Sequence, residues 1–479
     1  MRVLLAAASL AVLAACGEKP AAPAAETAAP AAKPSDDAAW PKQAVADPTS
    51  LGFTAEGLAA LDARMAKSVA DQDVAGMVTL LVKDGDVAQF KAYGVQSGDP
   101  KTGAPMTQDS MFRIYSMSKP ITGVAMMQLY EQGKWTLEDP VEKFVPELAN
   151  LKVLTMKDNK PVMKGGKPVL ADMKSKPTMR QLMSHSAGFG YGLCCTDPKG
   201  ATYNPSDEAF VKTGVLASKD LEEMIGKIKD IPLIYDPGTR WSYSVSVDIQ
   251  GLIVQRLSGQ KFGDYLKANV FTPLGMNDTS FFVTEANKPR FADVYSWDKA
   301  KSGLVAQVER PDRPGFSDPN RLESGGGGLV STTHDYGRFV QMLLNKGELA
   351  GNRVLKAESV DLMATNAIGD LGIYSDGTTA NPGRPGQKFG LDFAIYEDPA
   401  AGQNPYGKGT FYWGGAAGTW FWIDPVNKLA FVGMIQSMGG RRDGAMDFRA
   451  ESAKLTYGAL KSAAAPAAPA PATPAPAPH

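Results

Sequence analysis

The pattern of hydrophobic and polar positions near the start of the chain predicts a helix followed by a hairpin. Apolar residues recur at helical spacing over residues 54–69, which predicts an amphipathic helix. Two apolar runs of β-type composition follow, at 74–83 and 87–93. The Asp-Gly-Asp at 84–86 between them is typical of a tight turn, so we expect these two runs to pair as a β-hairpin.

The C-terminal part of the chain has a matching pattern in the opposite order. A helical pattern over residues 443–460 follows four apolar runs of β type. These runs are 389–396, 410–413, 419–423 and 430–436. Strands at both ends with helices between them predict an α/β (α+β) fold. We expect one antiparallel sheet, formed by both chain ends and flanked by helices, plus an all-helical subdomain.

Composition divides the chain into a body and two low-complexity segments. Residues 16–47 begin with a stretch rich in Ala, Pro and Glu, and residues 462–479 are almost wholly Ala and Pro. Such segments bury too little apolar surface to offset the entropy of ordering. We therefore expect a tether at 16–47, one folded domain at 48–461 and a disordered tail at 462–479.

The first fifteen residues have the features of an export signal. Arg2 supplies a positive charge, and the apolar run over 3–15 is too short to span a bilayer as a finished helix. The run ends in Leu-Ala-Ala-Cys, which resembles a bacterial lipobox. That resemblance implies acylation of Cys16 after cleavage, and Gly17 after it implies the outer membrane, facing the periplasm. The alternative is ordinary secretion with an incidental cysteine.

Charge and histidine content argue against several functions. The chain has 50 basic and 51 acidic residues, so it lacks the basic excess expected of a nucleic-acid-binding protein. Its three histidines, His185, His334 and His479, are far apart. We find no set of residues with metal-ligand spacing and expect no metal or cofactor. There is also no G-x-S-x-G motif, so serine chemistry here needs a base other than histidine.

The first candidate for such chemistry lies in Met-Phe-Arg-Ile-Tyr-Ser-Met-Ser-Lys-Pro, residues 111–120. A helical pattern begins there, and Ser116 and Lys119, three positions apart, face the same side of it. A lysine accepts a serine proton only when burial or nearby charge lowers its pKa. The same spacing occurs at Ser258 and Lys261, but there the helical pattern ends and the side chains need not converge.

A second candidate is Tyr243, which lies between a Pro-Gly turn and an apolar helical run. A tyrosine at such a junction can point into a site. Its phenol has a reference pKa near 10, and a neighbouring ammonium stabilises the phenolate, so Lys119 and Tyr243 can share one proton as a coupled base. The alternative is a packed surface aromatic residue.

The third candidate is the segment Trp-Gly-Gly-Ala-Ala-Gly that starts at Trp413. Glycines inside a strand pattern indicate close approach of the backbone to another group. Exposed N–H groups there can stabilise an oxyanion, which needs two such donors. The alternative is a bulge or a turn.

Together these residues resemble the serine β-lactamase and penicillin-binding protein superfamily and, most closely within it, the family VIII carboxylesterases. The resemblance covers nearly the whole body and includes further motifs at 178–188, 236–238, 272–276 and 325–329. It implies that Ser116 is the acylated nucleophile and that Lys119 activates it. It implies that Tyr243 is the general base and then the acid for the leaving group.

The same resemblance implies an oxyanion hole formed by the backbone N–H groups of Ser116 and Ala416. It also implies that the third motif of the superfamily, which binds substrate, corresponds to Trp413, Gly414 and Gly415.

Two departures from the lactamase pattern bear on the substrate. Val245 stands where related lactamases have Asn, and Trp413 stands where they have Lys. Both changes remove polar groups that hold a β-lactam, whereas an apolar wall suits an uncharged ester. We therefore expect a serine hydrolase that acts on a small-molecule ester or amide, favours esters, and has weak or no β-lactamase activity. The alternatives are a D-amino-acid peptidase, amidase or β-lactamase of the cell envelope, and a non-catalytic envelope binding protein of the same fold. We expect His185 to be structural.

Overall fold

The computed structural model describes residues 40, 44–193, 196–197, 199, 202–308, 314–375 and 381–461. The expected signal peptide, Cys16 and the tail at 462–479 lie outside these residues, as does most of the expected tether. The described part of the tether packs on the body. Trp40 is buried and its indole N–H donates to the Gly85 carbonyl at 2.7 Å, and the Val45 N–H donates to the Val87 carbonyl at 2.9 Å. The packed body therefore includes Trp40 and does not begin at residue 48.

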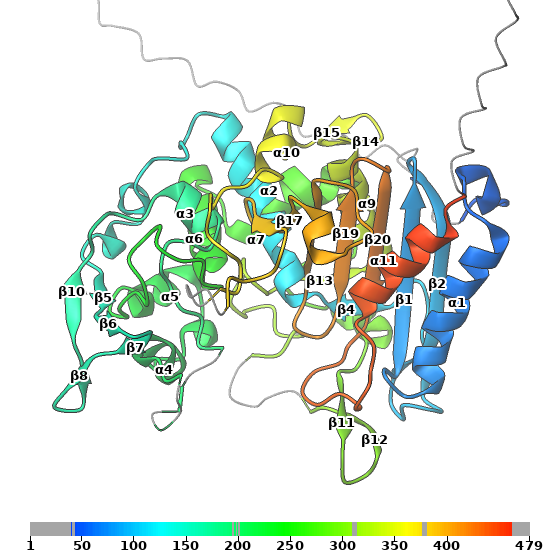
Figure 1. Ribbon diagram of the computed structural model, residues 1–479, viewed down its shortest axis with the longest axis horizontal. Coiled ribbons are helices and arrows are strands. Elements are labelled where there is room, and N and C mark those ends of the chain that lie inside the picture. The colour runs from blue at the N-terminus through cyan, green and yellow to red at the C-terminus, as the bar shows by residue number, and fades with distance from the viewer. Residues whose placement is uncertain are drawn as a thin grey trace, which may run out of the picture. The chain divides into compact units, whose positions relative to one another are not determined.

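One eight-stranded antiparallel sheet joins the two ends of the described chain, which confirms the predicted α/β architecture (Figure 1). The strand order is β16-β17-β18-β19-β20-β1-β2-β3. The N-terminal strands β1 to β3 therefore lie next to the C-terminal strands β16 to β20 in one sheet. The central pairing of β20 with β1 sets Val432 opposite Leu80. The strands are β1 Gly76–Lys83, β2 Asp86–Ser97, β3 Ala104–Pro105, β16 Gln387–Phe389, β17 Ala394–Tyr396, β18 Thr410–Gly414, β19 Trp420–Asp424 and β20 Leu429–Met434.

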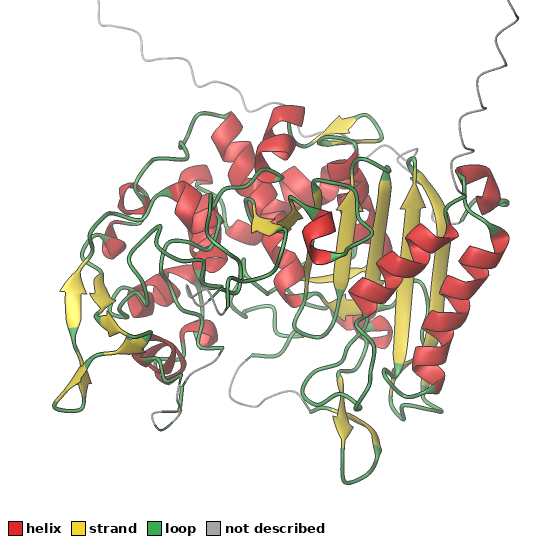
Figure 2. Cartoon of the chain, viewed as in Figure 1, coloured by secondary structure: helices red, strands yellow, loops and turns green. Residues whose placement is uncertain are grey.

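Helices cover both faces of this sheet (Figures 1 and 2). Helices α1 (Ala55–Ala70) and α11 (Phe448–Ala459) lie on one face, where the indoles of Trp420 and Trp422 both donate to Ser452 Oγ of α11, at 3.2 and 3.3 Å. Helix α9 (Thr333–Leu344) lies on the other face, where Tyr336 packs on Phe421 with ring centroids 5.4 Å apart. Burial on two faces explains why the central strands are continuous apolar runs without alternation.

The chain between β3 and β16 forms the helical part of the fold. Helix α2 (Ser118–Glu131) is buried along nearly its whole length and packs against α6 (Ser246–Ser258). A helix that is buried on nearly all sides takes such a central position. The other helices are α3 Met179–Met183, α4 Pro205–Lys212, α5 Leu221–Ile228, α7 Phe262–Leu266, α8 Thr272–Leu274 and α10 Ala357–Met363. The short strands are β4 Met111–Arg113, β5 Lys152–Leu154, β6 Met156–Lys157, β7 Lys160–Pro161, β8 Met163–Lys164, β9 Lys167–Pro168, β10 Leu170–Asp172, β11 Tyr295–Asp298, β12 Gly303–Ala306, β13 Val330–Thr332, β14 Glu348–Leu349 and β15 Asn352–Arg353.

Several element boundaries differ from those predicted, and two of the differences have a clear local cause. The run 389–396 is not one strand, because the chain reverses between β16 and β17 with Asp392 at a φ of +69°. The final helix begins at Phe448 and not at residue 443, since Asp447 acts as its N-cap and accepts from the Ala450 N–H at 3.1 Å. Both errors arise from local polar or glycine-dependent turns inside apolar runs.

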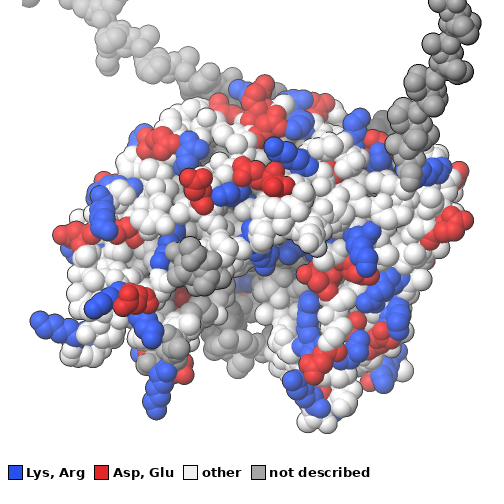
Figure 3. All heavy atoms as spheres, in the orientation of Figure 1, with Lys and Arg blue, Asp and Glu red and all other residues white. Residues whose placement is uncertain are grey.

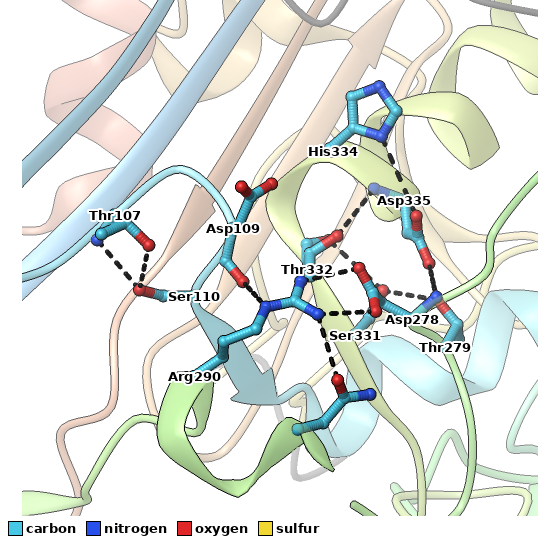
Figure 4. A network of polar contacts seen from close by, with 11 residues as sticks. Thr107, Asp109, Ser110, Asp278, Thr279, Arg290, Ser331, Thr332, His334 and Asp335 are labelled. Atoms are coloured by element: carbon cyan, nitrogen blue, oxygen red, sulfur yellow. Dashed lines mark hydrogen bonds and ion pairs between the residues drawn. The ribbon is translucent and has the colours of Figure 1, made fainter. Parts of the chain in front are cut away.

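A polar network fixes the strand pair that leads to the candidate site (Figure 4). Strand β13, which pairs with β4, runs directly into α9, and Asp335 of that helix accepts from the Asp278 N–H at 2.8 Å. Asp278 in turn binds both terminal nitrogens of Arg290, at 2.9 and 2.7 Å. Arg290 Nε donates to the Asp109 carbonyl at 2.9 Å, just before β4. Bidentate guanidinium–carboxylate pairs have defined geometry, so this network holds β4 in place.

Figure 3 shows Lys and Arg side chains interspersed with Asp and Glu on the face in view. No helix within the described ranges is long and apolar enough to cross a membrane. Over the same ranges, His, Cys, Asp and Glu side chains form no group of three or more suited to a metal ion.

Candidate active site

Ser116 lies at a sharp turn between strand β4 and helix α2. The short 3-10 helix Tyr115–Met117 forms this turn, and Tyr115 has a φ of +42°. Such a conformation is unfavourable for an aromatic residue, so the surrounding packing must enforce it. On the strand side, the Gln436 amide accepts from the Arg113 N–H at 3.2 Å and donates to the Arg113 carbonyl at 3.0 Å. The fixed turn leaves the Ser116 side chain partly exposed.

The structure brings together the three side chains predicted from distant motifs. The Tyr243 hydroxyl donates to Ser116 Oγ at 2.6 Å, and Lys119 Nζ donates to the same oxygen at 3.3 Å. Lys119 Nζ also lies 4.6 Å from the centroid of the Tyr243 ring, over its face. Ser116 Oγ therefore contacts one amine and one phenol.

Lys119 is fully buried, and its amine is held by three hydrogen bonds. The shortest, at 2.6 Å, goes to the Gly326 carbonyl, and the others go to the Tyr191 hydroxyl and to Ser116 Oγ, each at 3.3 Å. Burial lowers the pKa of Lys119 to about 8, although the carboxyl groups of Asp248 and Asp392 oppose this shift. At pH 7 about a tenth of the amine is therefore uncharged and able to accept a proton, and this fraction grows as the pH rises.

The pKa of Tyr243 is shifted in the opposite direction to that of Lys119. Burial raises its pKa above the usual value of 10, and its interactions with Ser116 and Trp413 only partly oppose this. The Lys119 amine faces the ring of Tyr243, whereas the phenol oxygen faces Ser116. In this geometry the phenol keeps its proton, and Lys119 is the group with the lower pKa.

His185 packs beneath Tyr243, with ring centroids 4.8 Å apart. Its Nδ1 accepts from the Ser244 N–H at 3.2 Å and lies 2.9 Å from Ser244 Oγ. Burial, together with the charge of Lys119, holds the pKa of His185 well below its usual value. The ring is therefore neutral, and its contacts fix the segment that carries Tyr243.

The segment that begins at Trp413 lies beside Ser116, at the end of β18. Trp413 is buried, and its ring centroid lies 5.5 Å from that of Tyr243 and 5.3 Å from that of Phe389. Gly415 packs directly on the Ile114 carbonyl, where a β-carbon would collide with it. This close approach explains the glycine.

After Gly415 the chain turns back into β19. The Gly415 N–H donates to the Thr419 carbonyl at 2.7 Å, and Gly414 ends β18 opposite Trp420. Ala416 follows at the exposed tip of the turn. The turn thus places the Ala416 backbone next to the segment that leads to Ser116.

Val245 is buried, and the second Ser-x-x-Lys pair is not brought together. The Val245 N–H donates to the Gly190 carbonyl at 3.0 Å. Ser258 Oγ donates to the Gln255 carbonyl at 3.4 Å, whereas Lys261 forms an ion pair with Glu323 at 2.8 Å. The expectation that the side chains of Ser258 and Lys261 need not converge is confirmed.

Sequence reasoning missed three residues around Lys119, namely Tyr191, Asp248 and Gly326. Two signals were present. The four glycines at 325–328 form a loop that packs against α2, where Thr122 Oγ1 donates to the Gly325 carbonyl at 2.9 Å. Asp248 is a carboxylate inside an otherwise apolar helical pattern, where an unpaired charge is costly.

Comparison with known proteins gives results that span most of the chain. A family model described as Beta-lactamase matches residues 61–455. Protein Rv1367c of Mycobacterium tuberculosis is 33% identical over 366 residues, which cover 76% of this chain and 86% of that protein. Esterase EstB of Burkholderia gladioli is 30% identical over 405 residues, which cover 81% and 92%. The solved structure of EstCE1, described as a hydrolase with promiscuous acyltransferase activity, aligns with a TM-score of 0.66 at 24% identity, over 84% of this chain and 99% of that one.

Proposed function

This chain belongs to the β-lactamase family, on the side of the family VIII carboxylesterases, and we propose that it hydrolyses carboxylic esters through an acyl-enzyme at Ser116. It is a serine hydrolase, and its resemblance to esterase EstB supports small-molecule esters as substrates. The observation that carries the mechanism is the contact of one oxygen, Ser116 Oγ, with both Tyr243 and Lys119.

In the proposed acylation step, neutral Lys119 accepts the Ser116 proton while the serine oxygen attacks the ester carbonyl. Backbone N–H groups of Ser116 and Ala416 stabilise the oxyanion, as in other acyl-transfer sites. Tyr243 donates its proton to the leaving alcohol, and the Lys119 ammonium returns a proton to the phenolate. Deacylation reverses these steps with water in place of the alcohol: Tyr243 passes its proton to Lys119, its phenolate takes a proton from the water that attacks the acyl carbonyl, and the Lys119 ammonium returns a proton to Ser116 as its bond to the acyl group breaks. The pKa order of Lys119 and Tyr243 favours this assignment over one in which Tyr243 acts first as the base.

The aromatic surroundings of Ser116 favour esters over β-lactams. The ring of Trp413 lies against that of Tyr243, and the ring of Trp241 stacks on Tyr243 with ring centroids 6.2 Å apart. Tyr374 packs on Trp241 at 4.7 Å and is partly exposed. Val245 adds no polar group. These aromatic side chains offer contact to an apolar acyl or alkyl group.

A fluorophosphonate probe followed by a substrate panel tests this function. We expect an adduct on Ser116 in the wild-type protein and none in the Ser116→Ala variant. We then expect turnover of p-nitrophenyl esters to exceed that of nitrocefin and of D-alanyl peptides. An unlabelled Ser116 would favour a non-catalytic binding protein, and faster cleavage of D-alanyl peptides would favour a peptidase.

We further propose that the protein is a lipoprotein of the bacterial outer membrane, held to it by its lipid anchor alone and facing the periplasm. The lipobox-like sequence before Cys16 supports this. Metabolic labelling with palmitate tests it: the wild-type chain should incorporate label and fractionate with membranes, whereas Cys16→Ala should do neither. Label-free secretion of the wild-type chain would contradict it.

A further inference from the structure

Asp248 is a buried carboxylate that the proposed reaction does not use directly. It lies in the first turn of α6 and is fully buried. Its Oδ1 accepts from the Gly326 N–H at 3.1 Å and from the Ser324 hydroxyl. Its Oδ2 is buried and accepts no hydrogen bond of good geometry from the described residues. A half-satisfied buried carboxylate is costly, so its retention calls for a physical reason.

The Tyr191 hydroxyl lies between this carboxylate and the Lys119 amine. The hydroxyl oxygen accepts from Lys119 Nζ at 3.3 Å, which leaves its own proton free to turn toward another acceptor. Burial raises the pKa of Asp248, and the charge of Lys119 and the hydrogen bonds from Ser324, Gly326 and Tyr191 oppose that rise. Burial, and after it the charge of Asp248, raises the pKa of Tyr191 well above its usual value, so the hydroxyl keeps its proton.

Gly326 allows these groups to meet. A β-carbon at this position would lie 2.6 Å from the Tyr191 oxygen and would collide with Asp248 Oδ2. The Gly326 N–H is bound by Asp248, while its carbonyl accepts from Lys119 Nζ at 2.6 Å. One peptide residue therefore connects the carboxylate to the amine on one side, and the Tyr191 hydroxyl connects them on the other.

We propose that Asp248 and Tyr191 are positioning residues for Lys119, which hold its amine against Ser116 and stabilise the ammonium that forms when Ser116 loses its proton. This inference rests on the proposed ester hydrolysis. The ammonium has three N–H donors, and Gly326, Tyr191 and the reacting oxygen of Ser116 are the three acceptors around it. The carboxylate behind Gly326 and Tyr191 orients both acceptors and supplies the opposite charge.

Other titratable groups also face Lys119, and they act differently. His185 stays neutral for the reasons given above, and the phenol of Tyr243 presents its ring face to the amine. Asp392 is fully buried against Gly123, one helical turn after Lys119 on α2, and Gln250 donates to its Oδ1 at 2.9 Å. Burial raises the pKa of Asp392 well above its usual value, and the hydrogen bond from Gln250 and the charge of Lys119 oppose this rise. Asp248 is therefore the carboxylate linked to Lys119 by hydrogen-bonding groups.

The pH profile of kcat/KM separates positioning of Lys119 from a merely structural role. Asp248→Asn keeps the shape and the acceptor for the Gly326 N–H but removes the charge. With p-nitrophenyl butyrate as substrate, we expect the rising limb of the profile to move to lower pH by about one unit, because the ammonium loses its counter-charge. We expect the plateau rate to fall as well, since the amine is held less firmly.

Tyr191→Phe should move the limb in the same direction, and combining it with Asp248→Asn should give less than the sum of the two shifts. Asp424→Asn is the matched control, because Asp424 is also buried and accepts backbone N–H groups, at 2.8 to 3.0 Å, but lies apart from Lys119. This control should keep the wild-type midpoint.

Labelling of Ser116 by a fluorophosphonate, followed against pH, gives a second readout that is independent of ester turnover. An Asp248→Asn protein with a lower rate and an unchanged midpoint would overturn the positioning role while leaving the proposed function intact. A wild-type protein that is not labelled at Ser116 would instead overturn the function itself.

Discussion

The Tyr243 hydroxyl lies 2.6 Å from Ser116 Oγ although the two residues are 127 positions apart in the chain. Ser116 lies before the buried helix α2, and Tyr243 lies before α6, which packs against α2. The contact therefore depends on the packing of two helices whose N-terminal ends face the same point. The motif around Ser116 and the motif around Tyr243 become one chemical unit only in the folded protein.

Removing the Tyr243 hydroxyl should slow the reaction with little effect on the fold. In Tyr243→Phe the ring still packs on His185 and Trp413, so we expect a melting temperature close to that of the wild type. The leaving alcohol loses its proton donor, and kcat should fall by about 100- to 10,000-fold, which is the usual contribution of general acid–base catalysis. Steady-state kinetics with p-nitrophenyl and alkyl esters measures this.

The loss should be larger for the alkyl esters, whose poorer leaving group needs the proton more. Equal losses for both substrates would contradict the role of proton donor.

The pH dependence of the wild-type enzyme should follow Lys119. Burial lowers the pKa of this amine to about 8, and only the neutral amine accepts the Ser116 proton. Below that pH the neutral amine is the minority form and decreases about tenfold for each pH unit, so kcat/KM should rise with pH and reach its half-maximum near pH 8. Lys119→Arg keeps the positive charge at all accessible pH values and should abolish the rise. A wild-type profile that stays flat from neutral to alkaline pH would show that another group accepts the proton.

The sequence was sufficient for the architecture because its strongest patterns are long. The apolar runs of β1 and β20, and the helical spacing of α1, persist over enough residues to identify strands and helices without a structure. The prediction of a single strand over 389–396 was wrong because one residue, Asp392, adopts a φ of +69° and the chain reverses there. Aspartate tolerates a positive φ, but an aspartate within an apolar run is not enough to predict that conformation from the sequence.

The roles of Tyr191, Asp248 and Gly326 around Lys119 were harder to predict from the sequence. Ser116 and Lys119 share one helical turn, so their spacing alone predicts their contact. Tyr191, Asp248 and Gly326 come from three separate segments, and each acts through the others. A buried carboxylate in an apolar helix and a run of four glycines are visible in the sequence, but which amine they serve depends on how α2, α6 and the glycine loop pack together.

The apolar character of the substrate site should be reversible by substitution. Trp413 and Val245 occupy positions where related β-lactamases carry Lys and Asn, according to the motif resemblance. The double variant Trp413→Lys, Val245→Asn should lose activity on uncharged esters, because an apolar contact with the acyl group is replaced by a charge. Its ratio of nitrocefin to ester turnover should rise by about tenfold or more, the effect of one well-placed polar contact. The matched control Trp413→Phe keeps an aromatic wall and should retain the wild-type preference. A double variant whose preference for esters is unchanged would show that other residues set the specificity.

Asp392 should reduce the stability of the folded protein as the pH rises. This carboxyl is fully buried, and burial raises its pKa in the folded state well above its usual value. A carboxyl with a raised folded pKa binds its proton more tightly when folded, so the folded state loses stability as the pH rises above the unfolded pKa of about 4. Asp392→Asn keeps an oxygen for the Gln250 amide and removes this pH-dependent cost. The melting temperature of Asp392→Asn should therefore exceed that of the wild type at pH 7 and above, and the difference should shrink as the pH falls toward 4. A difference that stays constant with pH would show instead that Asp392 is stably charged in the fold, with Lys119 as the counter-charge nearest to it.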